Sequence, residues 1–237
     1  MMFGRGGARR RGPEPVEEEP VPAVEWAGVR TFTIGTVERP VTKERPLPAR
    51  GPRAIRVPGG AGESKVFAPC AYVARTASAA PASAMEACLY EDSESQCLLC
   101  YLVVEEREGG ERCHRVYGAQ GEEIGAVRRI PPSNKLVKHT WRMDQPGHPE
   151  IVGRHEWVSG GAKHLAERAA LKVVTETVET VLTLGTYSGA SKSPSRTLEW
   201  WSGGELVMVS QSITTLTIKA NWLDRRLAFA YAFLGDS

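Results

Sequence analysis

The chain has 237 residues, of which 41% are apolar and 24% are charged, and its formal net charge is +2. This balance excludes a globally basic nucleic-acid-binding protein, and the length suits one large all-β domain or two small domains. Of the 30 basic residues 22 are Arg and 8 are Lys, which is typical of a GC-rich bacterial genome. Five cysteines and a start without an apolar leader predict a reduced cytosolic setting, with neither a signal peptide nor a membrane span at the beginning.

Residues 1–64 are rich in Pro, Gly, Arg and Glu, as in "RGPEPVEEEPVPAVE" and "RPLPARGPRAIRVPGG". Such a composition buries too little apolar surface to offset the entropy of ordering, so we predict a mostly disordered arm. One stretch differs, because "GVRTFTIGTVERPV" (28–41) alternates like a strand. That stretch either adds a strand or docks as a short arm.

From Lys65 onward the sequence changes to short β-type runs separated by turns. "KVFAPCAYVART" predicts one strand, and "MEACLYEDSESQCLLCYLVVEE" predicts two strands around a turn at 91–95. The stretch "RCHRVYGAQGEEIGAVRRI" predicts a hairpin that turns at Gln120 and Gly121, where glycine permits a positive φ. Pro131 and Pro132 then end the second strand, since proline donates no hydrogen bond.

Two further hairpins follow the same plan. The first turns at "DQPGHP" (144–149), and the second turns at Ser202, Gly203 and Gly204 before "TTLTIKA" adds another strand. About ten strands in all predict a mainly β domain over residues 65–237. An inserted helix is predicted near 161–185, although its second half, 175–184, is rich in Thr and Val and suits a strand equally well.

The last segment, "NWLDRRLAFAYAFLGDS", predicts a helix with Asn221 as N-cap and Gly235 at its end. Residues 227–234 are apolar on every side, so the helix must be surrounded by protein or by lipid. At about 20 Å, a helix over 222–234 is shorter than the ~30 Å apolar core of a bilayer, which favours the protein interior. We therefore expect a closed antiparallel β-barrel that encloses this segment as a plug made by Trp222, Leu223, Leu227, Phe229, Ala230, Tyr231, Phe233 and Leu234.

The hairpins "VYGAQGEEIGAVRR" and "LEWWSGGELVMVSQ", with the terminal "IKANWLDRRLAFAYAFLGD", resemble the tubby C-terminal-like superfamily, which includes LURP-one-related proteins and phospholipid scramblases. The resemblance covers Val66 to Asp236 and implies a barrel around a C-terminal helix. It also implies binding of phospholipid or phosphoinositide headgroups by basic side chains at the membrane periphery. Scrambling is not expected, because the sequence has neither a palmitoylation-type cysteine run nor an acidic calcium-binding loop.

The interval 124–143 contains five cations and no Asp or Glu, and these cations are the candidate anion-binding residues Arg128, Arg129, Lys135, Lys138 and Arg142. Such a cluster suits phosphate oxygens, with each near-surface cation contributing about 1 kcal/mol toward an anionic bilayer. A solvated barrel rim whose cations pair with acidic neighbours explains the same residues.

No cofactor, metal or catalytic residue is predicted. The "CLLC" motif with Cys113 and His114 has the composition of a zinc site, but strand geometry directs Cys97 and Cys100 to opposite faces. The five histidines are scattered and lack a nucleophile-elbow serine. The leading hypothesis is a non-enzymatic, cytoplasmic, anion-binding barrel. The alternatives are a protein-interaction module that uses the N-terminal arm and, less favoured, a nucleic-acid binder that uses the same arm.

Overall fold

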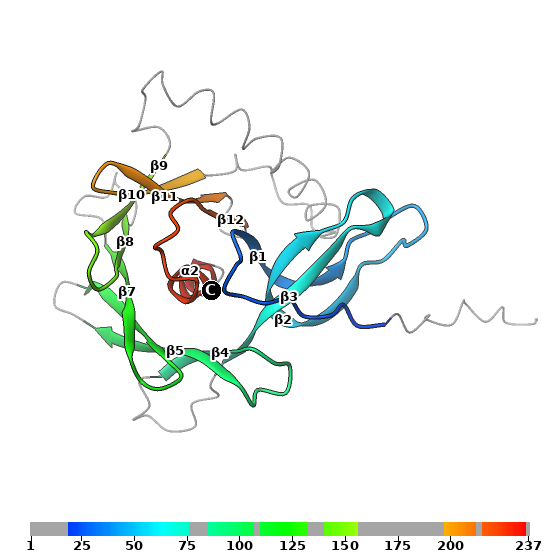
Figure 1. Ribbon diagram of the computed structural model, residues 1–237, viewed down its shortest axis with the longest axis horizontal. Helices are drawn as coiled ribbons and strands as arrows, with labels where there is room; N and C mark the ends of the chain where they lie inside the picture. The colour runs from blue at the N-terminus through cyan, green and yellow to red at the C-terminus, as the bar shows by residue number, and fades with distance from the viewer. Residues whose placement is uncertain are drawn as a thin grey trace, which may run out of the picture.

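A computed structural model describes residues 19–75, 85–106, 110–131, 140–155, 197–211 and 215–235. Within them, twelve strands surround one α-helix (Figure 1). The strands are β1 (Thr31–Arg39), β2 (Ala49–Gly59), β3 (Val66–Arg75), β4 (Met85–Tyr90), β5 (Leu98–Glu106), β6 (Arg112–Gly118), β7 (Glu123–Ile130), β8 (Thr140–Asp144), β9 (Ile151–His155), β10 (Thr197–Ser202), β11 (Glu205–Gln211) and β12 (Thr215–Ile218). The α-helix is α2 (Arg225–Gly235), and a short 3-10 helix, η1 (Gly62–Ser64), joins β2 to β3.

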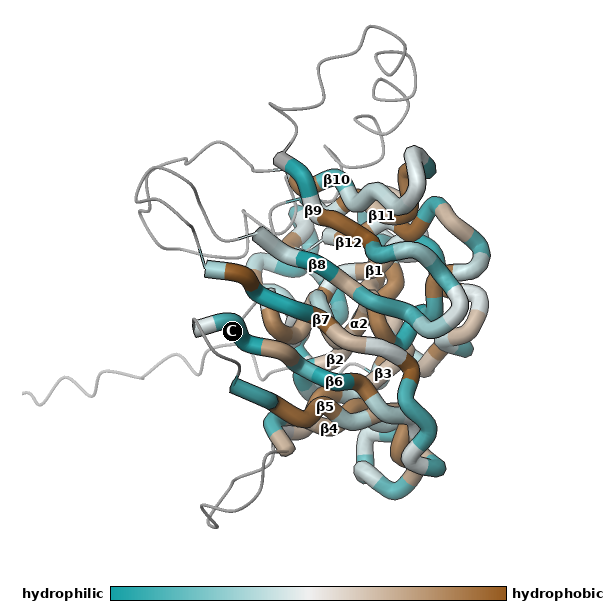
Figure 2. Tube along the Cα trace, turned by 90° about the vertical axis from the view of Figure 1, so that its left-hand side faces the viewer, coloured by the Kyte–Doolittle hydropathy of each residue, from teal (hydrophilic) through white to brown (hydrophobic). Residues whose placement is uncertain are grey.

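Each strand pairs antiparallel with its neighbours in chain order, and β12 pairs with β1 to close the barrel. The closed antiparallel barrel is therefore confirmed. One end, the turn end, carries the short connections at 91–97, 119–122, 145–150 and 203–204. We call the opposite end the mouth; there β6 begins and β7 ends, and the C-terminal end of α2 lies on this side in Figure 2.

The terminal apolar segment lies inside the barrel, as predicted. All eight residues from Leu227 to Leu234 are buried, and the helix is encircled by strands in Figure 1. The predicted N-cap is wrong, because α2 begins at Arg225, four residues after Asn221. Asp224 caps the helix instead, since its Oδ1 accepts a hydrogen bond from the Arg226 backbone N–H at 2.8 Å.

Aromatic rings hold the helix against the barrel wall. Phe229 meets Phe32 edge-on at 4.9 Å between ring centroids, and Tyr231 meets Trp200 in the same way at 4.5 Å. The Tyr231 hydroxyl lies 3.4 Å from the Ser210 hydroxyl. Burial raises the pKa of Tyr231 to about 12, so this side chain remains neutral inside the barrel over the usual pH range.

The linker between β12 and α2 closes the turn end. Gln145 holds this linker with both side-chain groups: its Nε2 donates to the Trp222 carbonyl, and its Oε1 accepts from the Asp224 N–H. Trp222, predicted as part of the plug, lies before the helix and is half-buried, with its ring stacked on His148 at 4.2 Å. Leu223 is buried, as expected of a plug residue.

The barrel begins earlier in the chain than the sequence indicated. The stretch 28–41 adds a strand, β1, but the expectation that the domain starts at residue 65 is wrong because β2 also precedes it. Two prolines and three arginines made 49–59 resemble coil, yet Ile55 contributes to the barrel core. Strand pairing with β1 and β3 satisfies this backbone, which composition alone does not reveal.

Arg56 explains how an arginine-rich segment joins a packed wall. Its guanidinium is buried and contacts the Glu38 carboxylate at 3.2 Å. It also donates to the carbonyl oxygens of Gly35, Pro52 and Phe67. One side chain thus joins β1, β2 and β3, and its charge is paired within the fold.

The predicted turns at 91–95, Gln120–Gly121, 144–149 and 202–204 all connect adjacent strands, and Gly121 has a φ of 82°. The predicted helix near 161–185, including the ambiguous half 175–184, lies outside the described residues, as do residues 1–18. In the part of the chain that the structure describes, no helix is long and apolar enough to cross a membrane.

Candidate functional site

The five candidate anion-binding residues do not form one cluster among the described residues. Arg128 on β7 and Arg142 on β8 are direct cross-strand partners. Arg129 is the partner of Trp141, so its side chain extends from the opposite face of the sheet. Lys135 and Lys138 lie outside the described residues.

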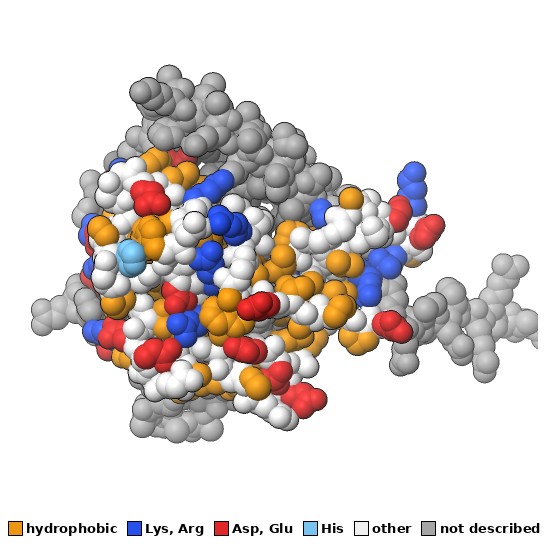
Figure 3. Space-filling view, viewed as in Figure 1, with side chains coloured by type: hydrophobic (Ala, Val, Ile, Leu, Met, Phe, Trp, Pro, Cys, Tyr) orange, Lys and Arg blue, Asp and Glu red, His pale blue; other side chains and the backbone are white. Residues whose placement is uncertain are grey.

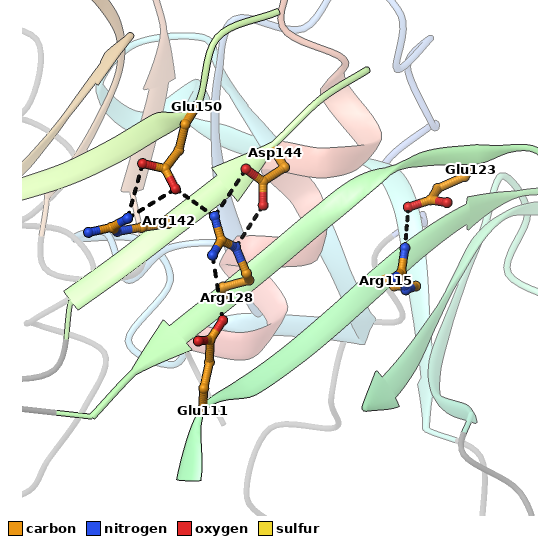
Figure 4. Close-up of polar contacts among 7 residues, drawn as sticks. All are labelled: Glu111, Arg115, Glu123, Arg128, Arg142, Asp144 and Glu150. Carbon is orange, nitrogen blue, oxygen red and sulfur yellow. Dashed lines mark hydrogen bonds and ion pairs between the residues drawn. The ribbon is translucent and has the colours of Figure 1, made fainter. Parts of the chain in front are cut away.

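Arg128 is surrounded by carboxylates on the outer face of the barrel (Figure 4). Its Nε and Nη2 donate to the two carboxylate oxygens of Asp144 at 2.7 and 3.1 Å, and Nη2 also donates to Glu150 at 2.5 Å. Nη1 lies 3.6 Å from Glu111. Burial lowers the pKa of Arg128, but the bonds to Asp144 and Glu150 outweigh burial and raise it above its usual value.

Glu150 bridges the two arginines of this pair. Its carboxylate accepts from Arg128 and, through both oxygens at 3.1 Å, from Nη1 of Arg142 (Figure 4). The interval 124–143 has no acid, but strand pairing brings three acids to it: Asp144 at the end of β8, Glu150 in the β8–β9 turn, and Glu111 just before β6. The protein therefore supplies its own anions to Arg128 and Arg142.

We expect Arg128→Ala to lower the free energy of unfolding by about 1–3 kcal/mol, since three half-buried carboxylates would lose their shared cation. Arg142→Ala is the matched comparison. Arg142 is more exposed, and Glu150 is its one carboxylate partner among the described residues, so its loss should change stability by less than about 1 kcal/mol. Urea denaturation followed by circular dichroism measures both, and equal effects would contradict a central role of Arg128 in this network.

A second arginine pair lies on the inner face at the mouth. Arg112, where β6 begins, is the direct cross-strand partner of Arg129 near the end of β7. The side chain of Trp141 points into the barrel, because its ring packs edge-on against Tyr231 of α2 at 5.3 Å. Arg129 is the cross-strand partner of Trp141, so its side chain lies on the same inner face. The Arg129 guanidinium lies over the Trp141 ring, 5.6 Å from its centroid. Arg112, Arg129 and Trp141 thus form one row across three strands.

Neither guanidinium of this inner pair has a carboxylate partner within 4.0 Å among the described residues. Glu106 is opposite Arg112 on β5, but no ion pair joins them. Both arginines are exposed. Like charges placed directly opposite on neighbouring strands destabilise a sheet unless an anion lies between them.

A contact between a histidine and a carboxylate lies next to this row. His114 is two residues after Arg112 on β6 and therefore extends from the same inner face. Its Nδ1 is 2.7 Å from a carboxylate oxygen of Glu86 on β4, and its side chain is 7% exposed. The inner face of the mouth thus combines two arginines, an indole, a histidine and a carboxylate.

Sequence reasoning missed Arg112, although a signal was present. A two-residue turn at Gln120 and Gly121 pairs residues whose numbers sum to 241, and this places Arg112 opposite Arg129. The observed register has this pairing from Val116 back to Arg112, although a bulge shifts the register next to the turn, where Tyr117 is opposite Glu123. Extending the predicted hairpin back from its turn would therefore have identified the pair.

The cysteines do not assemble a metal site in the described part of the chain. Cys97 is exposed, whereas Cys100 and Cys113 are buried. Burial raises the pKa of the Cys100 thiol to about 12, which disfavours the thiolate that a metal requires. No group of three His, Cys, Asp or Glu residues within the described ranges is placed to hold a metal ion.

The fold defines the class of this protein, a closed twelve-stranded antiparallel barrel around a buried helix. No protein-family model, curated protein or solved structure matches the chain. The evidence for function is therefore the geometry of its own residues.

Proposed function

We propose that this protein is a non-catalytic binding module for an anionic ligand, which the Arg112–Arg129 pair holds at the mouth of the barrel. One contrast carries the proposal. The chain bridges the arginine pair Arg128–Arg142 with its own Glu150, but it provides no carboxylate contact to Arg112 and Arg129 among the described residues. A ligand anion between the two inner guanidinium groups would offset their repulsion.

The barrel interior supports a binding role more than a catalytic one. The buried face of α2 and the inward side chains of the strands form one apolar core. Because the core is apolar and filled, we expect a ligand to bind at an end of the barrel, and the exposed Arg112 and Arg129 lie at the mouth. The resemblance of the sequence to the tubby C-terminal-like superfamily implies headgroup binding by basic side chains, and we include that resemblance in this proposal.

We propose a phospholipid or phosphoinositide headgroup as the ligand, bound at the cytoplasmic periphery of a membrane. Two planar guanidinium groups beside each other suit the oxygens of a phosphate, which bind arginine through paired hydrogen bonds. In sequence, Lys135 and Lys138 follow β7 within nine residues of Arg129. They would add to the attraction of an anionic surface, at about 1 kcal/mol for each cation near it.

Vesicle co-sedimentation tests this proposal. We expect the protein to bind phosphatidylcholine vesicles that contain phosphoinositide or phosphatidylserine, and Arg112→Gln/Arg129→Gln to weaken binding about tenfold or more because two contacts are lost. Arg30→Gln/Lys219→Gln is the matched control. It removes the same charge from exposed residues near the turn end, where basic side chains gather over β1, β12 and the start of α2 (Figure 3).

Equal loss in the two double variants would show only a general charge effect and would contradict a site at the mouth. Absence of binding to any anionic vesicle would overturn the lipid ligand. Sulfate binding, measured by calorimetry on the same proteins, separates a free anion from a lipid headgroup, because a free-anion site binds sulfate without vesicles.

A further inference from the structure

The His114–Glu86 pair is the one buried histidine contact described at the mouth. His114 is 5% exposed, and Glu86 comes from β4, on the far side of β5. The other described histidine whose side chain is placed, His148, lies in the β8–β9 turn and stacks on Trp222. The two imidazoles therefore belong to opposite ends of the barrel.

We propose that His114 is a proton-linked regulator of the anion site, so that protonation of its imidazole strengthens anion binding by Arg112 and Arg129. This inference rests on the proposed anion site and adds its regulation. The strand register supports this proposal. Arg112 is opposite Arg129 and His114 is opposite Val127, so His114 lies on the same face as the arginines and one row further into the barrel. Diagonal neighbours of this kind are about 7–8 Å apart.

The charges that face His114 fix the direction of the effect. On β4 it contacts Glu86; on β5 its partner is Val104, with Glu106 two residues further toward the mouth. On β7 its partner is Val127, and the cation on that side is Arg129. The face of α2 inside the barrel is apolar.

His114 lies against the Glu86 carboxylate, beside the two arginines. Protonation of the imidazole would add one positive charge there, and histidine is the side chain that ordinarily titrates between about pH 5 and 8. The added positive charge should strengthen the binding of an anion by Arg112 and Arg129. By linkage, a bound anion must raise the affinity of His114 for a proton by the same factor.

Sulfate is the suitable probe, because it remains a dianion throughout this range whereas phosphate changes its charge. We expect the wild-type protein to bind sulfate at least about threefold more tightly at about pH 5.5 than at about pH 8. This factor corresponds to two unit charges about 7 Å apart in water at low salt. His114→Gln should bind with one affinity at both pH values, and the matched control His148→Gln should retain the wild-type ratio.

A ratio near one in the wild type, or a ratio that persists in His114→Gln, would overturn the regulation while leaving the anion site intact. If sulfate does not bind at either pH, the same affinity ratio is measured with phosphatidylserine vesicles, and absence of binding to both probes would overturn the site and the regulation together. If His114→Gln does not fold, nuclear magnetic resonance of the wild-type imidazole replaces it. Saturating sulfate should then move the His114 titration midpoint to higher pH, and an unmoved midpoint would contradict the proposal.

Discussion

Phe229→Ala is expected to lower the free energy of unfolding by about 3–5 kcal/mol, the range for removal of a buried aromatic side chain. Phe229 is fully buried at the centre of α2, and its ring packs edge-on against Phe32 of β1. The surrounding strands form a closed wall, so they cannot collapse far into the space left by the ring. Urea denaturation followed by near-ultraviolet circular dichroism measures the change.

Phe229→Leu is the conservative comparison, because it keeps an apolar side chain of intermediate volume in the same place. We expect it to cost less than half as much as the alanine substitution. If Phe229→Ala changes stability by no more than a surface substitution, within about 0.5 kcal/mol, α2 is not the core of this barrel. The arrangement of the mouth, which depends on the contact between Tyr231 and Trp141, would then need revision as well.

Arg56→Met should also destabilise the protein by about 3–5 kcal/mol, since it breaks a buried ion pair from one side. The Glu38 side chain is 10% exposed, so its carboxylate would remain in the wall without its cation. Three backbone carbonyls, those of Gly35, Pro52 and Phe67, would lose their donor too. Burial already lowers the pKa of Arg56, and the Glu38 carboxylate opposes that shift.

A double substitution separates charge from packing. Arg56→Met/Glu38→Met removes the uncompensated carboxylate and should recover part of the lost stability, although the three carbonyls still lack the guanidinium donor. Arg115→Met is the matched surface control. Arg115 pairs with Glu105 and Glu123 but is 30% exposed, so its removal should cost less than about 1 kcal/mol. Equal losses for Arg56→Met and Arg115→Met would contradict the importance of burial.

The two arginine pairs differ in whether the protein supplies a carboxylate between them. Arg128 and Arg142 face outward and share Glu150, which stabilises the junction of β7 with β8 and the following turn. Arg112 and Arg129 face inward at the mouth and have no such bridge among the described residues. The proposed function and its proton linkage both depend on the inner pair, so the outer pair serves as an internal comparison.

Local pattern determined much of this architecture from the sequence alone. Alternation and turn residues located the hairpins, because side chains in a strand alternate between faces and tight turns need glycine. The all-round apolar run 227–234 indicated a surrounded helix, and its shortness indicated a protein interior. Composition misled at 49–59, where proline and arginine suggested coil but pairing with β1 and β3 makes a strand.

Only the tertiary structure decided which cations already have partners. The interval 124–143 contains no acid, yet Arg128 within it contacts three carboxylates, those of Glu111, Asp144 and Glu150, which lie elsewhere in the sequence. Charge pairing acts through space over a few ångströms, so it depends on register and strand order and not on separation along the chain. The sequence by itself determined a β-barrel with a helical plug, and the closed wall decided that Arg128 is structural while Arg112 and Arg129 face the mouth together.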